Sequence, residues 1–379
     1  MVEKCVYIFL RFLFIIKRRI YCIRNDKFQK IIIFAYTGLG NFILYTPFIK
    51  ELRKIFPKSI VTIIYDNKTK CIESIKGSNL FDELIFFKRN SSIIKILKMI
   101  IKLYINNYDL SINEFHNKST TLMLLTALSM RKYRMGHITS PDWYNKWDFI
   151  YNIPVEMKRN QHEIDRYLMF IAKLGFNKQV INKSTFFFIS KEDKNFAEDF
   201  IIKNELEGKK IIGIQAGSSS PTFWKRWGEE KYAKLSNLIL QIPDTEIILF
   251  GSSSEVYIIN RISKMITKKH INLAGMTSIK QSAAIINKIN ILVCNDSGLM
   301  HVAVAVGTPV IAIYGPTDYT RTAPLGKKHI IIRKEYNCGP CFKLHGQSEV
   351  RNCKFNYKCL NDITEEEVFK VIQKKLITL

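Results

Sequence analysis

The sequence predicts an α/β protein with two doubly wound parallel sheets. Short runs rich in Ile, Val and aromatic residues alternate with helical stretches, which is typical of parallel βαβ construction. The same alternation occurs in both halves of the 379-residue chain, and polar or glycine-rich turns follow several predicted strands. A chain of this length forms about two to three domains, so we expect one sheet in each of two domains.

The first half is predicted to contain four strands with helices between them. The strands are expected at residues 30–36, 59–65, 83–87 and 108–113. Helices are expected to begin near Asn41, Asn67 and Ser91. The last of these is strongly apolar and carries lysines along one side, at Lys95, Lys98 and Lys102. It either buries its apolar side on the sheet, which is the commoner arrangement, or faces a membrane.

The second half repeats the pattern. Strands are expected at residues 210–215, 246–250, 291–294 and 309–314, and helices at residues 229–241, 255–268, 278–288 and 299–306. Between the halves, residues 177–194 include a strand-like run, 186–188, with charged flanks. We therefore predict domains at residues 28–185 and 186–379.

Residues 1–27 are predicted to form a separate, basic and amphipathic segment. Its apolar run, residues 6–16, is interrupted by Arg11 and is shorter than the roughly 20 residues that span a membrane. Basic residues follow the run and no small-residue cleavage site is seen, so we do not expect a signal peptide. The segment is either an interfacial helix or a helix packed on its own domain. We expect a cytoplasmic protein, peripheral on the inner face of the cytoplasmic membrane, with reduced thiols.

The chain is strongly basic, with 58 Lys and Arg against 33 Asp and Glu, and a net charge of +25. Such an excess suits nucleic acid, an anionic membrane or a phosphorylated substrate. The basic residues are spread widely and no nucleic-acid-binding motif is recognised, so we expect no nucleic-acid partner.

Two turns after predicted strands contain glycines that let a ligand approach the backbone. The first contains Gly38, Gly40 and Asn41, but it is neither a full dinucleotide-binding motif nor a Walker A loop. The second, residues 215–220, continues into Lys225 and Arg226. Small residues, hydroxyls and two cations before a helix suit a diphosphate.

A third turn, residues 295–301, reads Asn-Asp-Ser-Gly-Leu-Met-His and leads from a strand into a helix. The backbone N–H groups of residues 297–299 form an expected anion site at the helix N-terminus. Asp296 either accepts hydrogen bonds from sugar hydroxyls or caps the helix. His301 is expected to point toward the same site.

These turns, in this order and spacing, resemble those of glycosyltransferase family 9, the heptosyltransferases of lipopolysaccharide core assembly. The resemblance runs from about residue 30 to residue 364 and is most specific at residues 273–278, 295–301 and 315–317. It implies a GT-B architecture, with two Rossmann-like domains facing across a cleft. It also implies an inverting reaction without a catalytic metal, an ADP-sugar donor on the C-terminal domain and an acceptor on the N-terminal domain.

The resemblance also implies the residues that bind the donor. They are Gly217, Ser218, Ser219, Lys225, Arg226, Met276, Thr277, Asp296, Ser297, Gly298, Leu299 and His301. Among them, Lys225 is expected to stabilise the negative charge of the departing ADP.

The chain departs from the family at the general base. The family carries an acid in the first glycine-rich turn, where this chain has Asn41, and an amide cannot accept a proton at neutral pH. Either Glu114 or Asp109 replaces that acid, or Asn41 orients the acceptor while water takes the proton, or the protein is inactive or altered in specificity. We expect an active enzyme with a substituted base.

Four cysteines lie within residues 338–359, at Cys338, Cys341, Cys353 and Cys359. A Cys-x-x-Cys pair is a good chelate, and some relatives that heptosylate autotransporter proteins carry a four-cysteine metal finger near this position. The alternatives are a structural Zn or Fe site and a set of free thiols. The scattered cysteines at positions 5, 22, 71 and 294 are expected to be free thiols.

The sequence thus favours transfer of a heptose or related sugar from ADP-heptose to a lipopolysaccharide core or a similar phosphorylated glycan. Transfer of heptose to a protein is the nearest alternative, favoured if the cysteines bind metal. A nucleotide-sugar epimerase shares the fold but not these motifs. The substitution at Asn41 also leaves open a non-catalytic protein that binds a nucleotide sugar or glycan.

Overall fold

The computed structural model describes residue 11 and residues 28–66, 70–114, 119–129, 132–138, 146–158, 161–177, 181–218, 220–342 and 352–378. The amphipathic segment predicted at residues 1–27, apart from Arg11, and the predicted site residue Ser219 lie outside these ranges. The chain divides into two compact units, Met1–Lys183 and Ser184–Leu379. This division falls two residues before the domain boundary predicted from the sequence.

The first unit contains a six-stranded parallel sheet with the strand order β3-β2-β1-β4-β5-β6. Its strands are β1 (Lys30–Ala35), β2 (Ile60–Tyr65), β3 (Glu83–Phe86), β4 (Leu110–Asn113), β5 (Tyr133–Ile138) and β6 (Ile153–Glu156). The first four confirm the sequence prediction. The last two were not predicted, because they contain Arg134, His137 and Pro154, which interrupt the apolar pattern of a buried strand.

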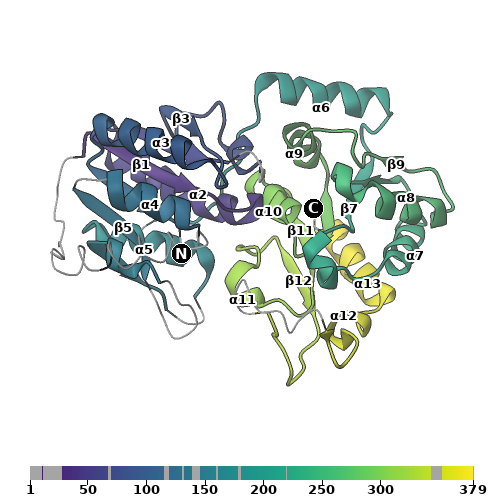
Figure 1. Cartoon of the computed structure of the whole chain (residues 1–379). Coiled ribbons are helices and arrows are strands. Elements are labelled where there is room, and N and C mark those ends of the chain that lie inside the picture. The colour runs from purple at the N-terminus through teal and green to yellow at the C-terminus, as the bar shows by residue number, and fades with distance from the viewer. Residues whose placement is uncertain are drawn as a thin grey trace. The chain divides into compact units, whose positions relative to one another are not determined.

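Helices cover both faces of this sheet (Figure 1). They are α2 (Leu39–Ile55), α3 (Ile93–Asn106), α4 (Thr120–Ser129) and α5 (Glu163–Lys173), with short 3-10 helices at Cys71–Ser74 and Asp148–Ile150. Side chains of α3 and α4 join one core with Ile32 and Phe34 of β1. Helices α2 and α5 contact each other through the ring pairs Tyr45–Tyr167 and Phe48–Phe170. Where the sequence predicts a helix starting near Asn67, the described residues contain only the 3-10 turn at Cys71–Ser74.

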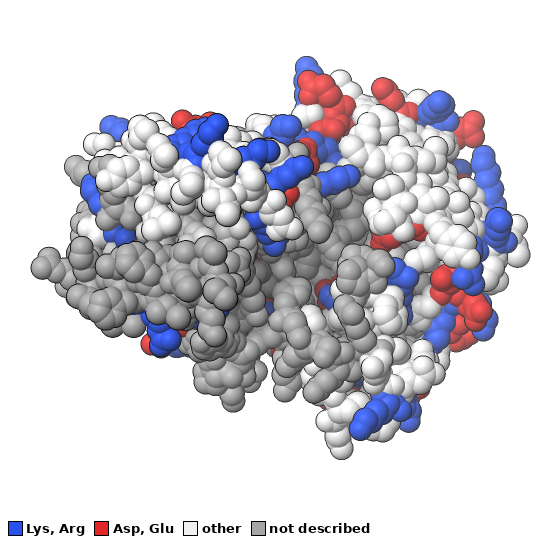
Figure 2. Space-filling model, in the orientation of Figure 1, with Lys and Arg blue, Asp and Glu red and all other residues white. Residues whose placement is uncertain are grey.

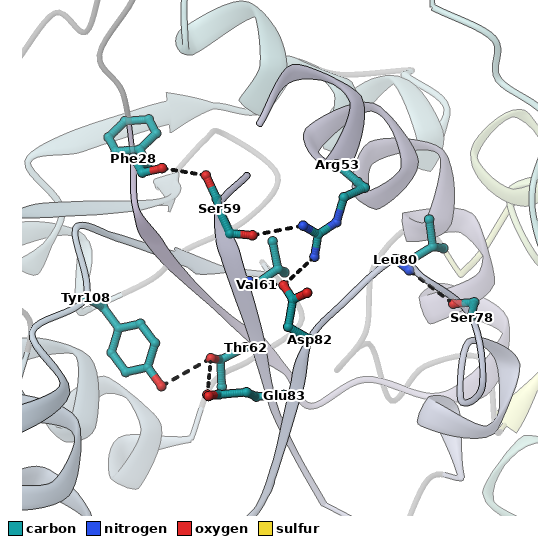
Figure 3. A network of polar contacts seen from close by, with 10 residues as sticks. All are labelled: Phe28, Arg53, Ser59, Val61, Thr62, Ser78, Leu80, Asp82, Glu83 and Tyr108. Carbon is teal, nitrogen blue, oxygen red and sulfur yellow. Dashed lines mark hydrogen bonds and ion pairs between the residues drawn. The ribbon is translucent and has the colours of Figure 1, made fainter. Parts of the chain in front are cut away.

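A polar network holds the amino ends of β2 and β3 to the end of α2 (Figure 3). The guanidinium of Arg53 donates to the Ser59 carbonyl over 2.8 Å and to Asp82 Oδ2 over 2.6 Å. The same Asp82 oxygen accepts from the Val61 backbone N–H over 2.7 Å. Ser59 Oγ in turn donates to the Phe28 carbonyl. One guanidinium therefore ties the beginnings of both strands to the end of α2.

The second unit repeats the arrangement with a six-stranded parallel sheet of order β12-β11-β10-β7-β8-β9. Its strands are β7 (Lys210–Gln215), β8 (Thr245–Leu249), β9 (Ile271–Asn272), β10 (Ile291–Asn295), β11 (Val310–Tyr314) and β12 (Ile330–Arg333). The strands β7, β8, β10 and β11 confirm the prediction. The two-residue strand β9 and the edge strand β12 were not predicted from the sequence.

Two groups of helices sandwich this second sheet (Figure 1). The helices of the unit are α6 (Lys191–Lys203), α7 (Glu229–Ile239), α8 (Val256–Met265), α9 (Ile279–Lys288), α10 (Gly298–Ala305), α11 (Tyr319–Thr322), α12 (Lys358–Asn361) and α13 (Glu365–Ile377), with 3-10 turns at Ser220–Lys225 and Ser253–Glu255. Residues of α7, α8 and α13 share one core, and residues of α6, α9 and α10 share the other. The run at residues 186–188 is not a strand, which corrects the sequence interpretation.

The strand order places one switch point in each sheet. In the first unit the chain leaves β1 in one direction along the sheet and returns to β4 on its other side. In the second unit the corresponding pair is β7 and β10. Ligands of open α/β sheets bind outside the carboxyl ends of the strands at such a point. The glycine-rich turn follows β1, and the polar turns follow β7 and β10. All three turns therefore lie at the carboxyl ends of strands that flank a switch point.

No helix among the described residues is long and apolar enough to cross a membrane. Helix α3 buries Leu103 and packs Ile96, Met99 and Ile100 against the core. The predicted packing on the sheet is therefore present, but only for part of the apolar surface of this helix. The remaining apolar side chains are exposed.

Candidate functional site

The side chain of Asn295, fully buried at the end of β10, joins the turns that follow β7 and β10. Its Oδ1 accepts from the Trp227 backbone N–H over 3.1 Å and from the Tyr232 hydroxyl over 2.9 Å. Its Nδ2 donates to the Ala216 carbonyl over 2.8 Å. A buried amide that makes these bonds has little freedom to move. The turn before Trp227 is thereby held against the end of β10.

This attachment brings Lys225 and Asp296 together. Lys225 Nζ lies 2.7 Å from Asp296 Oδ2, although the two residues are 71 positions apart in sequence. Burial raises the pKa of the Asp296 carboxyl, but the charge and hydrogen bond of Lys225, the charge of His301 and a hydrogen bond from Thr317 outweigh it. The net result is a pKa below the ordinary value. Asp296 is therefore a carboxylate at neutral pH, and the ammonium group of Lys225 is fixed beside it.

The cation of Lys225 also lies against two aromatic rings. Its Nζ is 5.6 Å from the centre of the Trp224 ring and 5.9 Å from that of Phe342. The two rings contact each other, with centres 4.9 Å apart. Rings at this distance attract a cation and limit the side-chain conformations open to it. The position of the Lys225 ammonium group is thus restricted by Asp296 and by the two rings.

Arg226 holds the turn after β7 from the other side. Its guanidinium donates to the Ser218 carbonyl over 2.7 Å and to Ser218 Oγ over 3.1 Å. Ser218 Oγ donates to the Thr222 carbonyl over 2.9 Å. Arg226 and Ser218, both predicted to touch the ligand, therefore bind each other in this structure. Their contact shapes the turn that carries Lys225.

Helix α10 starts next to the ion pair. Ser297 precedes the helix, and its Oγ donates to Gln215 Oε1 over 2.7 Å instead of capping the helix. The first-turn backbone N–H groups, from Gly298 and Leu299 onward, are not capped by that side chain, so they can bind an anion. His301 follows in the first turn, is 5% exposed and lies near Asp296. Lys225, Asp296 and His301 therefore lie close together, and their role in donor binding stays a prediction.

Glu255, which was not among the residues predicted from the sequence, lies beside the turn after β7. It follows β8, and its Oε2 accepts from the Ser252 backbone N–H over 2.7 Å. A Cβ atom at position 217 would lie 2.0 Å from Glu255 Oε1, so a larger residue there would force the Glu255 side chain to move. The capping sequence Ser-x-x-Glu at residues 252–255 indicates the contact of Glu255 with Ser252, but not its approach to Gly217. A buried carboxylate therefore borders the turn that contains Gly217.

Met276 and Thr277 lie in the turn between β9 and α9. Met276 is 73% exposed, and Thr277 Oγ1 shares a 2.7 Å hydrogen bond with Ser282 Oγ. The preceding Gly275 has a φ of +73° and donates its N–H to the Gly251 carbonyl at the end of β8. This turn therefore lies at the carboxyl edge of the sheet, beside the end of β8.

In the first unit, the predicted acceptor-side residues follow β1 and β4, which are neighbours in the sheet. Gly38 precedes α2, and Gly40 and Asn41 lie in its first turn. Glu114 follows β4, is 1% exposed and accepts a hydrogen bond from the Tyr167 hydroxyl over 2.9 Å. Glu114 therefore lies at the carboxyl end of β4, and Asn41 lies in the helix that follows the adjacent strand β1.

Asp109 lies at the other edge of the same sheet, immediately before β4. Its carboxylate accepts from the backbone N–H groups of Gln29 and Lys30 and pairs with Lys132 at 2.7 Å. These contacts hold the amino ends of β1 and β4 together. The turn that carries Asn41 lies at the opposite, carboxyl edge of the sheet. We therefore do not retain Asp109 as a base.

The four clustered cysteines line one open cavity of about 1510 Å³, together with the turn after β11. Burial and the neighbouring thiols of Cys341, Cys353 and Cys338 raise the pKa of Cys359 to about 11. The Tyr357 backbone N–H donates to Cys353 Sγ over 3.3 Å. Among the described residues, no three His, Cys, Asp or Glu side chains are arranged as a metal site. The thiols are thus neighbours without forming a closed ligand set in this structure.

Comparison with known proteins places these features in a family. The sequence model of glycosyltransferase family 9 (heptosyltransferase) matches residues 96–350. A lipooligosaccharide heptosyltransferase 2 from Campylobacter jejuni is 29% identical over 222 residues, which cover 57% of this chain and 65% of that protein. Lipopolysaccharide heptosyltransferase 3 from Escherichia coli is 25% identical over 357 residues, covering 89% of this chain and 95% of that protein. The alignments to the first curated relatives span less than two thirds of their length.

Solved structures share the fold. A family 9 glycosyltransferase from Veillonella parvula superposes with a TM-score of 0.78 at 23% identity, covering 95% of this chain and all of that one. E. coli heptosyltransferase WaaC with ADP gives a TM-score of 0.66 at 18% identity, with coverage of 91% and 99%. The iron-containing glycosyltransferase TibC of E. coli gives 0.56 at 12%, with coverage of 94% and 78%. These likenesses confirm the predicted GT-B fold class.

We predict that Asn295→Ala lowers the free energy of unfolding by about 3 kcal/mol or more, since it leaves several buried donors and acceptors without partners. Denaturant unfolding followed by fluorescence measures the loss. Asn290→Ala is the matched control, because Asn290 Oδ1 accepts one hydrogen bond, from the Ile211 N–H, at the opposite edge of the sheet. Its expected cost is about 1 kcal/mol. Equal losses in the two variants would contradict the central role of Asn295.

Proposed function

Because the chain belongs to glycosyltransferase family 9, we propose that it transfers a heptose from ADP-heptose to a lipopolysaccharide core acceptor. The observation that carries the proposal is the Lys225–Asp296 pair beside the N-terminus of α10. An oriented cation and a row of backbone N–H groups suit the diphosphate of a nucleotide sugar. The WaaC structure named above holds ADP, which supports adenine as the nucleobase of the donor.

In this proposal the donor lies along the carboxyl edge of the second sheet. Lys225 and the N–H groups of residues 297–299 bind the diphosphate, and Asp296 and His301 complete the pocket. Asp296 accepts hydrogen bonds from sugar hydroxyls through the oxygen lone pairs that Lys225 and Thr317 leave available. Gly217 keeps the backbone accessible beside the carboxylate of Glu255, which is placed to accept from further hydroxyls. Met276, exposed at the same edge, provides an apolar surface for the nucleobase.

The transfer is an inverting displacement. An acceptor oxygen forms a bond to the anomeric carbon while the bond from that carbon to the diphosphate oxygen breaks. The electron pair leaves with ADP, where Lys225 and the α10 N-terminus stabilise the added charge. The acceptor hydroxyl proton passes to a general base. This reaction uses no catalytic metal.

We propose Glu114 as that base, because Asn41 carries an amide and Asp109 lies at the other sheet edge. Glu114 follows β4 beside the turn of Asn41, and a carboxylate accepts a proton where an amide does not. Asn41 would orient the acceptor through its side-chain amide. The acceptor site in this proposal belongs to the first unit, and the donor site to the second.

The four cysteines favour a second candidate function, transfer of heptose to a protein. Their thiols line one cavity, and a metal held there would have a structural role. The TibC structure, which shares the fold, is described as iron-containing. A Zn or Fe ion held by Cys338, Cys341, Cys353 and Cys359 is therefore part of this second proposal.

A lipopolysaccharide core acceptor is anchored in a membrane, so this proposal also places the protein on the inner face of the cytoplasmic membrane. The net charge of +25 suits both a phosphorylated acceptor and an anionic lipid surface.

We predict selective binding of ADP and ADP-heptose over UDP, GDP and CMP in calorimetry. Lys225→Met should weaken ADP binding at least about tenfold, because a charge-assisted contact to phosphate is lost. Lys264→Met, which changes an exposed lysine of α8, is the matched control and should leave binding unchanged. Preference for another nucleotide would overturn the proposed donor while leaving the fold class intact.

We predict that Glu114→Gln lowers kcat at least about 100-fold, as expected on loss of a general base. Gln keeps an oxygen that can accept from Tyr167, so the unfolding curve and the ADP affinity should not change. ADP release in the presence of core oligosaccharide measures turnover, and Asp109→Asn is the control expected to retain kcat. Retained turnover in Glu114→Gln would leave water, oriented by Asn41, as the proton acceptor.

The second candidate function predicts about one Zn or Fe per chain in protein purified without chelator, measured by elemental analysis. Cys338→Ser with Cys341→Ser should release the metal, whereas Cys71→Ala, a buried thiol of the other unit, should retain it. Absence of both metals would exclude the metal site and, with it, the argument for a protein acceptor.

A further inference from the structure

Helix α3 exposes an apolar strip that the core of the first unit does not use. Ile93, Ile94, Leu97, Ile101 and Ile105 are between 52% and 74% exposed. Scattered exposed apolar residues are ordinary on a protein surface, but a contiguous group marks an interaction surface. Here five large side chains lie within 13 residues of one helix.

The strip has a regular position on the helix. With 3.6 residues per turn, the five exposed side chains fall within a sector of about 120°. The core-facing residues Ile96, Met99, Ile100 and Leu103 occupy the sector on one side of it. Lys95, Lys98 and Lys102 occupy the sector on the other side, and all three are exposed. The apolar strip therefore lies between the core-facing side of the helix and the row of lysines.

The charge of this surface has one sign. The sequence of α3 contains no Asp or Glu, and none of its three lysines forms an ion pair with a described residue. In the space-filling view, the area over α3 is mostly white and blue (Figure 2). A partner for this surface must accept apolar side chains and offer negative charge beside them.

We propose that α3 docks on an anionic lipid surface, with the apolar strip in the boundary between headgroups and acyl chains and the lysine row on the phosphates. Apolar side chains next to a lysine row are the arrangement by which an interfacial helix binds such a surface. A second copy of the chain fits less well, because a two-fold contact with antiparallel α3 helices brings like-charged lysine rows together, and one with parallel helices leaves each row without an acidic partner on α3. The inference does not depend on the proposed sugar transfer.

The test uses the full chain and sedimentation with vesicles. Vesicles of phosphatidylglycerol and phosphatidylethanolamine should bind the protein, and pure phosphatidylcholine vesicles should bind it much less. The combined substitutions Ile94→Gln, Leu97→Gln and Ile101→Gln should weaken binding at least about tenfold at every salt concentration. The combined substitutions Lys95→Gln, Lys98→Gln and Lys102→Gln should weaken it similarly at low salt and less at high salt.

Matched controls lie in the second unit. Ile202, Tyr257 and Ile377 are exposed apolar residues, and Lys191, Lys194 and Lys203 are exposed lysines of α6. Replacing either set with Gln should leave vesicle binding unchanged. Since the substituted α3 side chains are exposed, thermal unfolding of the α3 variants should match that of the parent.

Three results would overturn the inference. Unchanged vesicle binding in the apolar variant would exclude this face, and an accompanying loss of thermal stability would indicate that the chain itself covers it. Equal losses in the control sets would indicate non-specific adsorption. A shift from dimer to monomer in the apolar variant, measured by light scattering without lipid, would assign the strip to a second copy.

Discussion

The organisation of the candidate donor site depends on one buried amide, the side chain of Asn295. Both ends of this side chain are hydrogen-bonded, to Trp227 and Tyr232 through the oxygen and to Ala216 through the nitrogen. These bonds hold the turn after β7 against the end of β10. Lys225 and Asp296 are 71 positions apart in sequence, and these bonds help to keep their charges 2.7 Å apart. The amide is therefore a positioning group for a site whose chemistry belongs to its neighbours.

The buried ion pair has a cost as well as a role. Removing both charges from water is unfavourable, and the attraction between them offsets this only when further hydrogen bonds are present. Thr317 and the nearby His301 provide additional stabilisation of the Asp296 carboxylate, and two rings surround the Lys225 cation. Such a pair adds little net stability, but it fixes the direction of both groups. A preorganised cation is what the departure of a diphosphate requires.

The two units use the same construction for different purposes. Each sheet reverses its strand order once, and in each the polar turns lie at that point. In the second unit the turns are rich in cations and helix N–H groups, which suits a nucleotide diphosphate. In the first unit the turn carries Asn41, with Glu114 on the adjacent strand, and the outer helix α3 presents apolar and basic side chains together. The proposed acceptor chemistry and the proposed lipid docking thus both involve the first unit.

The sequence by itself determined the fold class, eight of the strands and the polar turns that follow β1, β7 and β10. These features follow from local rules: alternation of apolar residues marks a buried strand, and glycine and polar residues mark a turn. The strands β5 and β6 escaped detection because their burial comes from neighbours rather than from an apolar sequence. Residues 186–188 show the reverse case, since an aromatic run has strand propensity but pairs with no strand.

Only the tertiary structure decided which polar residues meet. Asp109 and Glu114 are five positions apart in sequence, yet a strand places them at opposite edges of the sheet, and this separated a residue that anchors strands from a candidate base. Glu255 approached Gly217 through packing between turns that no local pattern records. The exposure of the strip on α3 was likewise undecided by sequence, because an apolar helix surface is the same pattern whether it meets a core, a lipid or water. Long-range contacts settle such questions, since burial is a property of the neighbours that the fold supplies.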